Sequence, residues 1–282
     1  MGSHTRGLGL SDAALPLLRD LVHDRCGIFF EQSRCDLLAE RLAPLVLERG
    51  FESFLDYYYL LKYDESSSAE WLRVMDALAV PETYFWREMD QIHALVQVIV
   101  PSLVGILGGR PLRIWSVPCA GGEEPLTIAM MLDDAGWFAR APIEIHGSDG
   151  SPAAIARARA GRYRDRAFRT LPEQFKTRYF RADGDAWRPT DQLSARITSW
   201  SVVNLVDDAI VTANAARCAV IFCRNLFIYF SETTIRSVVE RLAEAMPSPG
   251  YLCIGASESL LRITNRFCLE EIGGAFVYVR QP

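Results

Sequence analysis

The stretch that decides the fold is Leu112-Arg113-Ile114-Trp115-Ser116-Val117-Pro118-Cys119-Ala120-Gly121-Gly122-Glu123-Glu124-Pro125. Its apolar first part, residues 112–117, predicts a buried strand. The small residues that follow let the backbone approach a ligand closely. The two carboxylates and the proline at its end predict the first turn of a helix. This order is typical of a cofactor-binding loop, although the same residues also serve as ordinary turn and capping residues.

The two carboxylates narrow the class of ligand. A loop that holds a pyrophosphate leaves the positive end of its helix free for the anion, whereas Glu123 and Glu124 place negative charge there. The loop also lacks the G-x-G-x-x-G pattern of nicotinamide enzymes. We therefore expect a cationic or hydroxyl-rich ligand. S-adenosylmethionine fits, because it carries an amino group, a sulfonium and a ribose diol but no phosphate.

Composition places the chain among globular proteins. Its 282 residues, 50% of them hydrophobic, suffice for one large domain or two smaller ones. The longest apolar run, residues 92–107, is interrupted by polar residues, a proline and a glycine, so we predict no membrane-spanning helix. The formal charge of -5 argues against a nucleic-acid binder. Residues 1–4 resemble an expression remnant with no secretory segment after them, which favours a cytoplasmic protein.

The cysteines and histidines show no metal-ligand spacing. The 7 cysteines are odd in number, scattered and mostly inside apolar runs such as 220–223, which indicates buried free thiols rather than a disulfide framework. Beyond the first residues, His23, His93 and His146 lack companion ligands in the sequence. We therefore predict that the protein binds no metal.

The chain divides into a helical part and an α/β part. Residues 10–80 predict a helical domain, with helices over 11–25, 54–62 and 70–78 and an apolar stripe between them formed by Leu37, Leu38, Leu42, Leu45 and Val46. Residues 81–110 predict a linker and the first helix of the second domain. From 111 to 282, strands alternate with helices, which predicts a doubly wound α/β domain. Residues 162–200 break this alternation and predict a small inserted subdomain.

Within the α/β part, each element has a distinct pattern. The predicted strands are 112–117, 143–148, 197–203, 220–223, 251–255 and 275–280, and the predicted helices are 125–134, 152–160 and 233–246, the last with Ser231 as its N-cap.

Polar residues gather directly after these strands. Ligands of open α/β sheets bind beyond the carboxyl ends of the strands. The residues found there are Gly121, Gly122 and Glu123 after the first strand, Asp149 after the second, Asn204 and Leu205 after the third, and Arg224 and Asn225 after the fourth. Asp149 is placed to accept hydrogen bonds from a ribose diol. Its alternative role is the N-cap of the helix at Pro152, which Ser151 could equally fill.

Four motifs resemble those of the CheR-type chemotaxis receptor methyltransferases and follow in the same order. They are Pro81-Glu82-Thr83-Tyr84-Phe85-Trp86-Arg87-Glu88, Trp115-Ser116 with Gly122-Glu123-Glu124-Pro125, Phe222-Cys223-Arg224-Asn225-Leu226-Phe227-Ile228-Tyr229-Phe230, and Gly255-Ala256-Ser257-Glu258. The resemblance covers nearly the whole chain from Leu10. It implies a helical N-terminal domain joined to a class I methyltransferase domain, Rossmann-like, with an inserted β-subdomain. The implied reaction is methyl transfer from S-adenosylmethionine to glutamates of chemoreceptor cytoplasmic helices.

The resemblance also implies roles for single residues. The implied cofactor site consists of Thr83, Arg87, Gly121, Gly122, Glu123, Asp149, Asn204, Leu205, Arg224 and Asn225. In it, Glu123 would bind the amino group of the cofactor and Asp149 its ribose. Arg87 and Tyr229 are expected nearest the methyl group and the acceptor carboxylate. Alternatively, Arg87 pairs with a neighbouring glutamate on the surface, and Tyr229 belongs to the core.

Receptor recognition is expected outside the cofactor pocket. Arg34, Arg41 and Arg49 stand two turns apart on one predicted helix and could meet an acidic receptor helix, although interleaved acidic residues leave a solvated face equally open. Other chemosensory proteins are possible further partners, and a monomer is expected. Residues 179–200 resemble a β-subdomain that grips a receptor C-terminal peptide in some family members. Its short turn, at 183–192, favours a member that does without this tether.

The chain also departs from the family pattern. Pro118 and Ala120 stand where the family usually has glycine and serine, Trp86 replaces a second phenylalanine, Pro81 replaces a hydrogen-bonding residue, and Gly150 replaces a commoner apolar residue. Two alternatives stay open. One is a degenerate cofactor-sensing or scaffold module, which Pro118 and the altered loop favour, and the other is a class I methyltransferase with a different acceptor.

Overall fold

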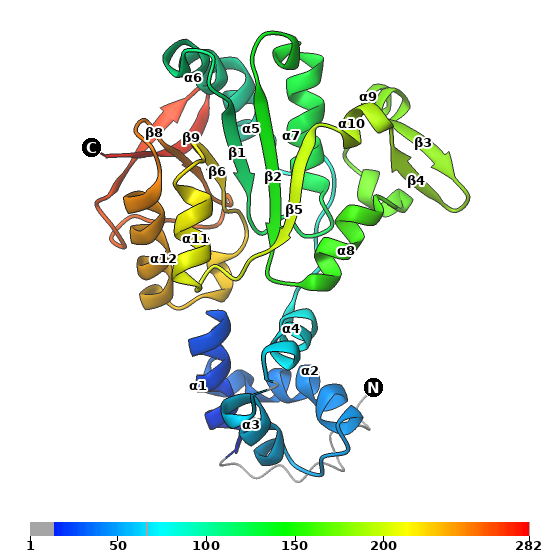
Figure 1. The fold of residues 1–282 in the computed structure, drawn as a ribbon, viewed down its shortest axis with the longest axis vertical. Helices are drawn as coiled ribbons and strands as arrows, with labels where there is room; N and C mark the ends of the chain where they lie inside the picture. The colour runs from blue at the N-terminus through cyan, green and yellow to red at the C-terminus, as the bar shows by residue number, and fades with distance from the viewer. Residues whose placement is uncertain (1–13, 66, 282) are drawn as a thin grey trace.

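The computed structural model describes residues 14–65 and 67–281 and arranges them as a helical domain beside an α/β domain (Figure 1). The helices of the N-terminal domain are α1 (Ala14–Cys26), α2 (Cys35–Glu48), α3 (Phe54–Tyr63) and α4 (Ser67–Leu78). They pack around an apolar core that includes Leu18, Tyr57 and Val74. The predicted start of the first helix, at Ser11, lies outside the described residues.

The apolar stripe predicted for α2 is confirmed with one exception. Leu38, Leu42, Leu45 and Val46 are buried in the core of the domain, as their helical spacing requires. Leu37 is 42% exposed, because it lies one position away from this stripe and therefore on another side of the helix.

Within residues 67–281, one 7-stranded sheet forms the centre of the α/β domain. Its strands, in spatial order, are β5 (Ile197–Val202), β2 (Ile143–Asp149), β1 (Leu112–Ser116), β6 (Val220–Phe222), β7 (Tyr251–Cys253), β9 (Ala275–Arg280) and β8 (Phe267–Ile272). The pairs from β5 to β7 are parallel, and β9 is antiparallel to both of its neighbours. The strand β8 was not among those predicted from the sequence. Buried and exposed residues alternate only weakly along this edge strand. It is joined to β9 by a turn at Gly273 and Gly274, both of which have positive φ.

Helices cover both faces of this sheet, as Figure 1 shows, so the prediction of a doubly wound fold is confirmed. One apolar core contains side chains of α7 (Glu123–Asp134), and the other contains side chains of α11 (Asp208–Ala215) and α12 (Glu232–Ala245). Ser231 caps α12 as predicted, since its side chain accepts from the backbone N–H of Thr234. The strand order reverses between β1 and β6, and this is where open sheets of this kind bind ligands.

The helical stretch from Asp90 to Leu107 comprises α5 (Asp90–Ala94), a π-helical turn (Leu95–Ile99) and α6 (Val100–Leu107). By length and composition alone it is the one helix of the described residues that could cross a membrane, despite the interruptions seen in the sequence. One side of it, which includes Leu95 and Ile99, is buried in the core of the α/β domain, whereas Val98 and Ile106 are exposed. The core packing therefore accounts for part of its hydrophobicity.

The inserted segment forms a small subdomain after α8 (Pro152–Ala160). It contains a 3-10 turn (Asp165–Phe168), α9 (Glu173–Tyr179), the antiparallel strands β3 (Phe180–Asp183) and β4 (Ala186–Pro189), and α10 (Asp191–Ser194). The turn expected over 183–192 is wrong, because β4 and α10 occupy most of that range and the strands connect through Gly184 and Asp185. Phe85 packs between the rings of Phe168 and Phe180, which fixes the subdomain to the segment before the sheet.

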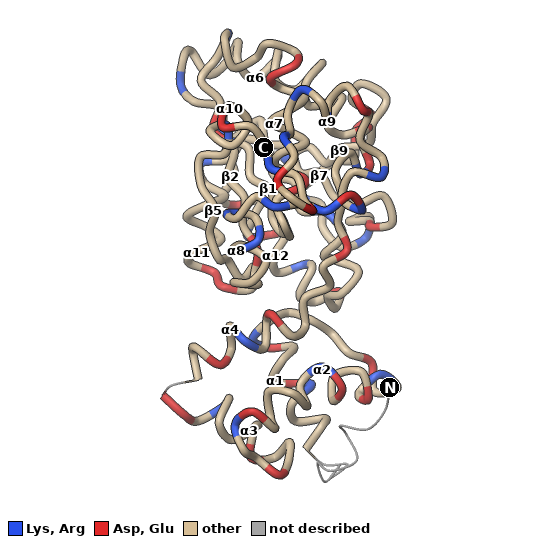
Figure 2. The backbone as a smooth tube through the Cα atoms, turned by 90° about the vertical axis from the view of Figure 1, so that its right-hand side faces the viewer, with Lys and Arg blue, Asp and Glu red and all other residues tan. Residues whose placement is uncertain are grey.

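Charged residues of both signs are mixed along both domains (Figure 2). The predicted free thiols are confirmed: all of the cysteines lie in the described residues without disulfides, and five of them are buried. No group of three or more potential metal ligands lies close together within the described ranges 14–65 and 67–281.

Candidate functional site

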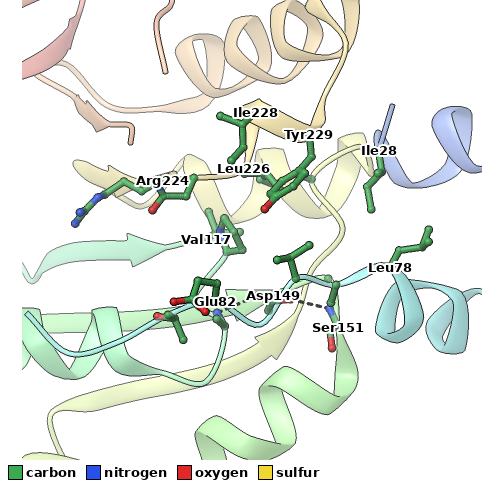
Figure 3. Close-up of a pocket in the computed structure, with 18 of the residues that line it drawn as sticks. Ile28, Leu78, Glu82, Val117, Asp149, Ser151, Arg224, Leu226, Ile228 and Tyr229 are labelled. Atoms are coloured by element: carbon green, nitrogen blue, oxygen red, sulfur yellow. Dashed lines mark hydrogen bonds between the residues drawn. The ribbon is translucent and has the colours of Figure 1, made fainter. Parts of the chain in front are cut away.

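A cavity opens beyond the carboxyl ends of the strands, where the sheet order reverses. The loops after β1, β2, β5 and β6 form one wall. The N-terminal domain forms the other, and Figure 3 shows its Ile28 and Leu78 on the opposite side from Arg224. The predicted residues that line this cavity are Thr83, Arg87, Asp149, Asn204, Leu205, Arg224, Asn225 and Tyr229, together with Arg34 and Arg41. Segments far apart in sequence therefore meet at one site.

Asp149 lies at the end of β2 with 9% of its surface exposed. Its Oδ1 accepts from the backbone N–H of Ser151 and its Oδ2 from that of Ala120, both at 2.9 Å (Figure 3). The N-cap of α8 is Ser151, whose Oγ accepts from the N–H of Ala154 at 3.0 Å, so the capping alternative for Asp149 is wrong. Burial raises the pKa of Asp149. Each carboxylate oxygen keeps a free lone pair for a hydroxyl donor.

The two adjacent glutamates of the glycine loop have different surroundings. Glu124 lines the cavity, accepts from the Ser116 hydroxyl at 2.7 Å and pairs with Arg224 at 3.2 Å. Glu123 instead lines a second depression, which shares Glu82 and Thr83 with the first. Its Oε2 is buried without a hydrogen-bond partner among the described residues. Burial raises the pKa of Glu123 to about 7.

Gly121 and Gly122 shape the loop without lining the main cavity. Gly122 has a φ of +95°, and a Cβ there would lie 2.9 Å from the Trp200 ring and 3.1 Å from the Tyr163 hydroxyl oxygen. The Tyr163 hydroxyl also donates to the carbonyl of Gly121 at 2.8 Å. The two glycines therefore allow the loop to pack tightly against the inserted subdomain and α8. Neither glycine lines the main cavity, although the adjacent Ala120 does, and their part in cofactor binding stays a prediction.

Arg224 joins three of the four motifs. It is 4% exposed, and its guanidinium donates to the carbonyls of Arg87 and Glu88 at 3.0 and 3.1 Å and pairs with the carboxylates of Glu88 and Glu124. Burial opposes ionisation of Glu88, but the charge of Arg224 and hydrogen bonds from Ala256 and Asn225 outweigh it and lower its pKa. Arg224 therefore fixes the cavity wall.

Arg87 and Tyr229 lie at the cavity with parts of their side chains accessible. The Arg87 guanidinium donates to the Glu82 carbonyl at 3.0 Å and lies 3.5 Å from the Glu88 carboxylate, so it combines a place on the cavity wall with the pairing considered as its alternative. Tyr229 is 36% exposed and therefore is not a core residue. Its carbonyl accepts from the N–H of Phe29 at 2.7 Å, which joins the two domains at the cavity.

Asn204 also contacts the N-terminal domain. Its Nδ2 donates to the carbonyl of Arg25 at 2.6 Å, and its Oδ1 accepts from the N–H of Val206 at 3.3 Å. The neighbouring Leu205 is buried and contributes an apolar part of the wall.

Of the three arginines predicted to form one face, two line the cavity and one does not. Arg34 belongs to the 3-10 turn before α2, and Arg41 to the helix itself; both line the cavity. Arg49 is the C-cap of α2 and pairs with Glu70, a fully buried carboxylate that also accepts from the Tyr57 hydroxyl at 2.8 Å. A buried charge requires a partner inside the domain, and Arg49 supplies it with a side chain that is 40% exposed. Its part in receptor recognition stays a prediction.

One organising residue was missed. Glu258, in the last of the four motifs, accepts from the backbone N–H groups of Gly255, Asn225 and Ile228 at 2.6, 2.9 and 3.2 Å. It thereby supports the loop after β6, where Asn225 has a positive φ of 58°. The sequence motif that contains Glu258 was recognised, but its residue spacing did not indicate what this glutamate does.

The hydrogen-bond acceptors of the site fit S-adenosylmethionine. Asp149 offers two carboxylate oxygens to a diol, and Glu123 offers an unpaired buried acceptor to an ammonium group. The described ligand-facing loops show no glycine-rich helix N-terminus free for phosphate, since Glu123 and Glu124 occupy the first turn of α7. The fold and site together define an S-adenosylmethionine-dependent methyltransferase of class I.

Comparison with known proteins gives the family. Residues 13–79 match the all-alpha domain of CheR methyltransferase, and residues 81–274 match its SAM binding domain. The chain belongs to the CheR methyltransferase family, as the motifs predicted.

Three named relatives align over most of this chain. It is 34% identical to chemotaxis protein methyltransferase 2 of Vibrio cholerae, over 92% of this chain and 89% of the relative. It is 28% identical to chemotaxis protein methyltransferase 1 of Pseudomonas aeruginosa, over 96% and 99%. It is also 32% identical to a probable biofilm formation methyltransferase, WspC, of Pseudomonas putida, over 92% of this chain and 60% of that protein.

Proposed function

We propose that this enzyme transfers the methyl group of S-adenosylmethionine to glutamate side chains of a chemoreceptor cytoplasmic domain, as a monomer in the cytoplasm. The products are glutamyl methyl esters, which serve sensory adaptation, and S-adenosylhomocysteine, which leaves as the sulfonium loses its methyl group. The main supporting observation is the single cavity at the switch point, which gathers residues of the Thr83–Arg87 segment, Asp149, Asn204 and the Arg224-Asn225 pair. Membership of the CheR family supports the carboxylate as acceptor.

Within this proposal, each wall residue has a defined task. Asp149 binds the ribose hydroxyls and Glu123 binds the amino group, because these are the acceptors with lone pairs to spare. Thr83 lies between the two depressions and can contact the connecting part of the cofactor. Leu205 and Asn225 contribute to the wall of the cavity. When bound, S-adenosylmethionine supplies an electrophilic methyl group on its sulfonium.

The acceptor needs alignment rather than a general base. A glutamate carboxylate is already ionised at neutral pH, so no proton has to be removed before it attacks. Arg87 can orient this carboxylate, and the Tyr229 hydroxyl can donate a further hydrogen bond to it. The weak 3.5 Å contact between Arg87 and Glu88 can be exchanged for the substrate, since Glu88 keeps Arg224 and Asn225 as partners. Alignment and exclusion of water lower the barrier.

The test is methyl transfer from labelled S-adenosylmethionine to receptor cytoplasmic fragments. We expect label that is released as methanol by mild base, which identifies an ester, and none on a fragment whose acceptor glutamates are replaced by alanine. A base-stable product would identify another acceptor. Absence of S-adenosylhomocysteine binding in calorimetry would instead indicate a scaffold that does not use the cofactor.

Arg87→Ala tests the proposed alignment. We expect kcat for methyl-ester formation to fall at least about 100-fold, because the acceptor carboxylate loses its charged partner. Circular dichroism and thermal unfolding should remain close to the parent protein. Undiminished turnover would remove Arg87 from the mechanism.

We also propose that the receptor C-terminal peptide is not required, because the connection between β3 and β4 is short. Receptor fragments with and without their C-terminal residues should then be methylated at equal rates. A strong preference for the longer fragment would contradict this proposal.

A further inference from the structure

The loop that carries Asp149 is supported from the other domain. Asp76 belongs to α4 of the N-terminal domain, and its Oδ1 accepts from the Ser151 hydroxyl at 2.5 Å and from the backbone N–H of Ala153 at 2.9 Å. Ser151 in turn donates its backbone N–H to Asp149 at 2.9 Å. A chain of hydrogen bonds therefore runs from α4 to the carboxylate expected to bind the ribose.

The Ser151 hydroxyl has two tasks that depend on this contact. It accepts from the N–H of Ala154 at 3.0 Å as the N-cap of α8, and it donates its own hydrogen to Asp76. Ser151 is 2% exposed, so without Asp76 this donor would be buried and would lose its partner. Asp76 also places a negative charge at the positive end of α8, which is favourable there.

A second contact involves the neighbouring residue on α4. Gly150 stands between Asp149 and Ser151, and a Cβ at this position would lie 2.2 Å from Cε of Met75. The space beside Gly150 is therefore filled by the N-terminal domain rather than by a side chain of the loop. A side chain at position 150 would have to displace the flexible end of Met75.

We propose that Asp76 and Met75 are positioning residues for cofactor binding, through which the helical domain sets the geometry of the Asp149 loop. The inference rests on the proposed function, in which Asp149 binds the ribose of S-adenosylmethionine. Neither residue acts on the reacting atoms. Their removal therefore affects binding of the cofactor much more than the chemical step.

The first experiment measures S-adenosylhomocysteine affinity by calorimetry for three variants of the whole chain. Asp76→Ala should raise Kd about tenfold, because a charged hydrogen-bond acceptor is lost. Asp76→Asn keeps an acceptor oxygen and should stay within about threefold of the parent. Arg73→Ala, on the same helix, removes the ion pairs with Glu48 and Glu70, neither of which contacts the Asp149 loop, and should leave Kd unchanged.

Methyl transfer supplies the second readout. With a receptor fragment as acceptor, Asp76→Ala should raise KM for S-adenosylmethionine about tenfold and leave kcat within about twofold. Equal Kd and KM in Asp76→Ala and the parent would overturn the inference and leave the proposed function intact. A parent protein that binds no S-adenosylhomocysteine would overturn the proposed function itself.

A pair of substitutions, at Gly150 and Met75, tests the contact between these two residues. The test remains valid even if the Asp76 variants fail to fold. Gly150→Leu should weaken S-adenosylhomocysteine binding about tenfold, because the new side chain requires the space of Met75. Combining it with Met75→Ala should restore most of the affinity. A double variant that binds no better than Gly150→Leu alone would overturn the role of Met75.

Discussion

The two walls of the cavity differ in how their side chains are fixed. On the side of the sheet, the polar residues are buried and already bonded, as in Asp149 and Arg224, which are 9% and 4% exposed. On the side of the N-terminal domain, Phe29 and Leu37 are 47% and 42% exposed and stand beside Arg34 and Arg41. One wall is preorganised for a small polar ligand. The other offers apolar and basic groups of the kind that suit an acidic protein surface.

The largest expected effect comes from breaking the preorganised wall. Asp149→Ala should raise Kd for S-adenosylhomocysteine at least about 100-fold, since two charge-assisted hydrogen bonds are lost and Ala120 is no longer fixed. Calorimetry measures this change. Asp207→Ala is the matched control, because it removes a helix-capping aspartate, that of α11, which does not line the cavity. Similar losses in both variants would mean that general destabilisation, not the wall, is responsible.

Reversing the charge of the N-terminal wall of the cavity should weaken binding of the receptor substrate. Arg34→Glu combined with Arg41→Glu should raise KM for a receptor fragment roughly 10- to 30-fold and change Kd for S-adenosylhomocysteine little. Kinetics at two salt concentrations should show that the loss is electrostatic. Unchanged receptor kinetics would refute the assignment.

Arg49→Ala compares Arg49 with Arg41, which belongs to the same helix, α2, and lines the cavity. We expect it to lower the melting temperature, because the fully buried Glu70 loses an ionic partner. Receptor KM should remain that of the parent. A receptor defect without a loss of stability would return Arg49 to the recognition surface.

The pH dependence of cofactor affinity should report on Glu123. With a pKa raised to about 7 by burial, Glu123 is largely protonated below that pH, and a cationic amino group binds its ionised form better. Affinity for S-adenosylmethionine should therefore increase, by up to about tenfold, as the pH rises from about 6 to about 8. Calorimetry across this range should give a flat profile for Glu123→Gln. An equally steep profile in that variant would assign the titration to another group.

The smallest expected effect concerns the glycine loop. Ala120 has a φ of +49°, which is unfavourable for a residue with a Cβ. Ala120→Gly should raise the free energy of unfolding by up to about 1 kcal/mol, since the strain relieved exceeds the added entropy of the unfolded chain. Chemical denaturation measures the change. A destabilised variant would show that the alanine methyl group contributes more packing than the strain removes.

Much of the fold followed from local patterns in the sequence. The alternation of strands and helices, the cap at Ser231 and the loop at 117–122 are visible because each depends on neighbouring residues. The edge strand β8 was missed, because its alternation is weak and its pairing partner decides its conformation. The N-terminal wall of the cavity was missed for a related reason, since Phe29 and Met75 carry no local signal of a ligand site.

The residues of the candidate site also divide into those that local sequence patterns predicted and those that depend on tertiary packing. Asp149, Arg224 and Asn225 were found because they follow strands whose ends must meet at one edge of the sheet. The different surroundings of Glu123 and Glu124 could not be predicted. Adjacent residues on a helix point in different directions, and only the packing of the helix against its neighbours decides what each of them contacts. The separation of Arg49 from Arg34 and Arg41 depended on a buried carboxylate 21 positions away.

The sequence by itself determined the class of fold, the family and the chemical types of residue at the cofactor loop, because these follow from periodicity, spacing and motif order. Only the tertiary structure decided which carboxylate remains unpaired, which arginines line the cavity and how α4 supports the loop that follows Asp149. The physical reason is that burial and hydrogen-bond pairing depend on residues far apart in the chain. Asp76 and Ser151, for example, are separated by 75 positions and lie within hydrogen-bonding distance.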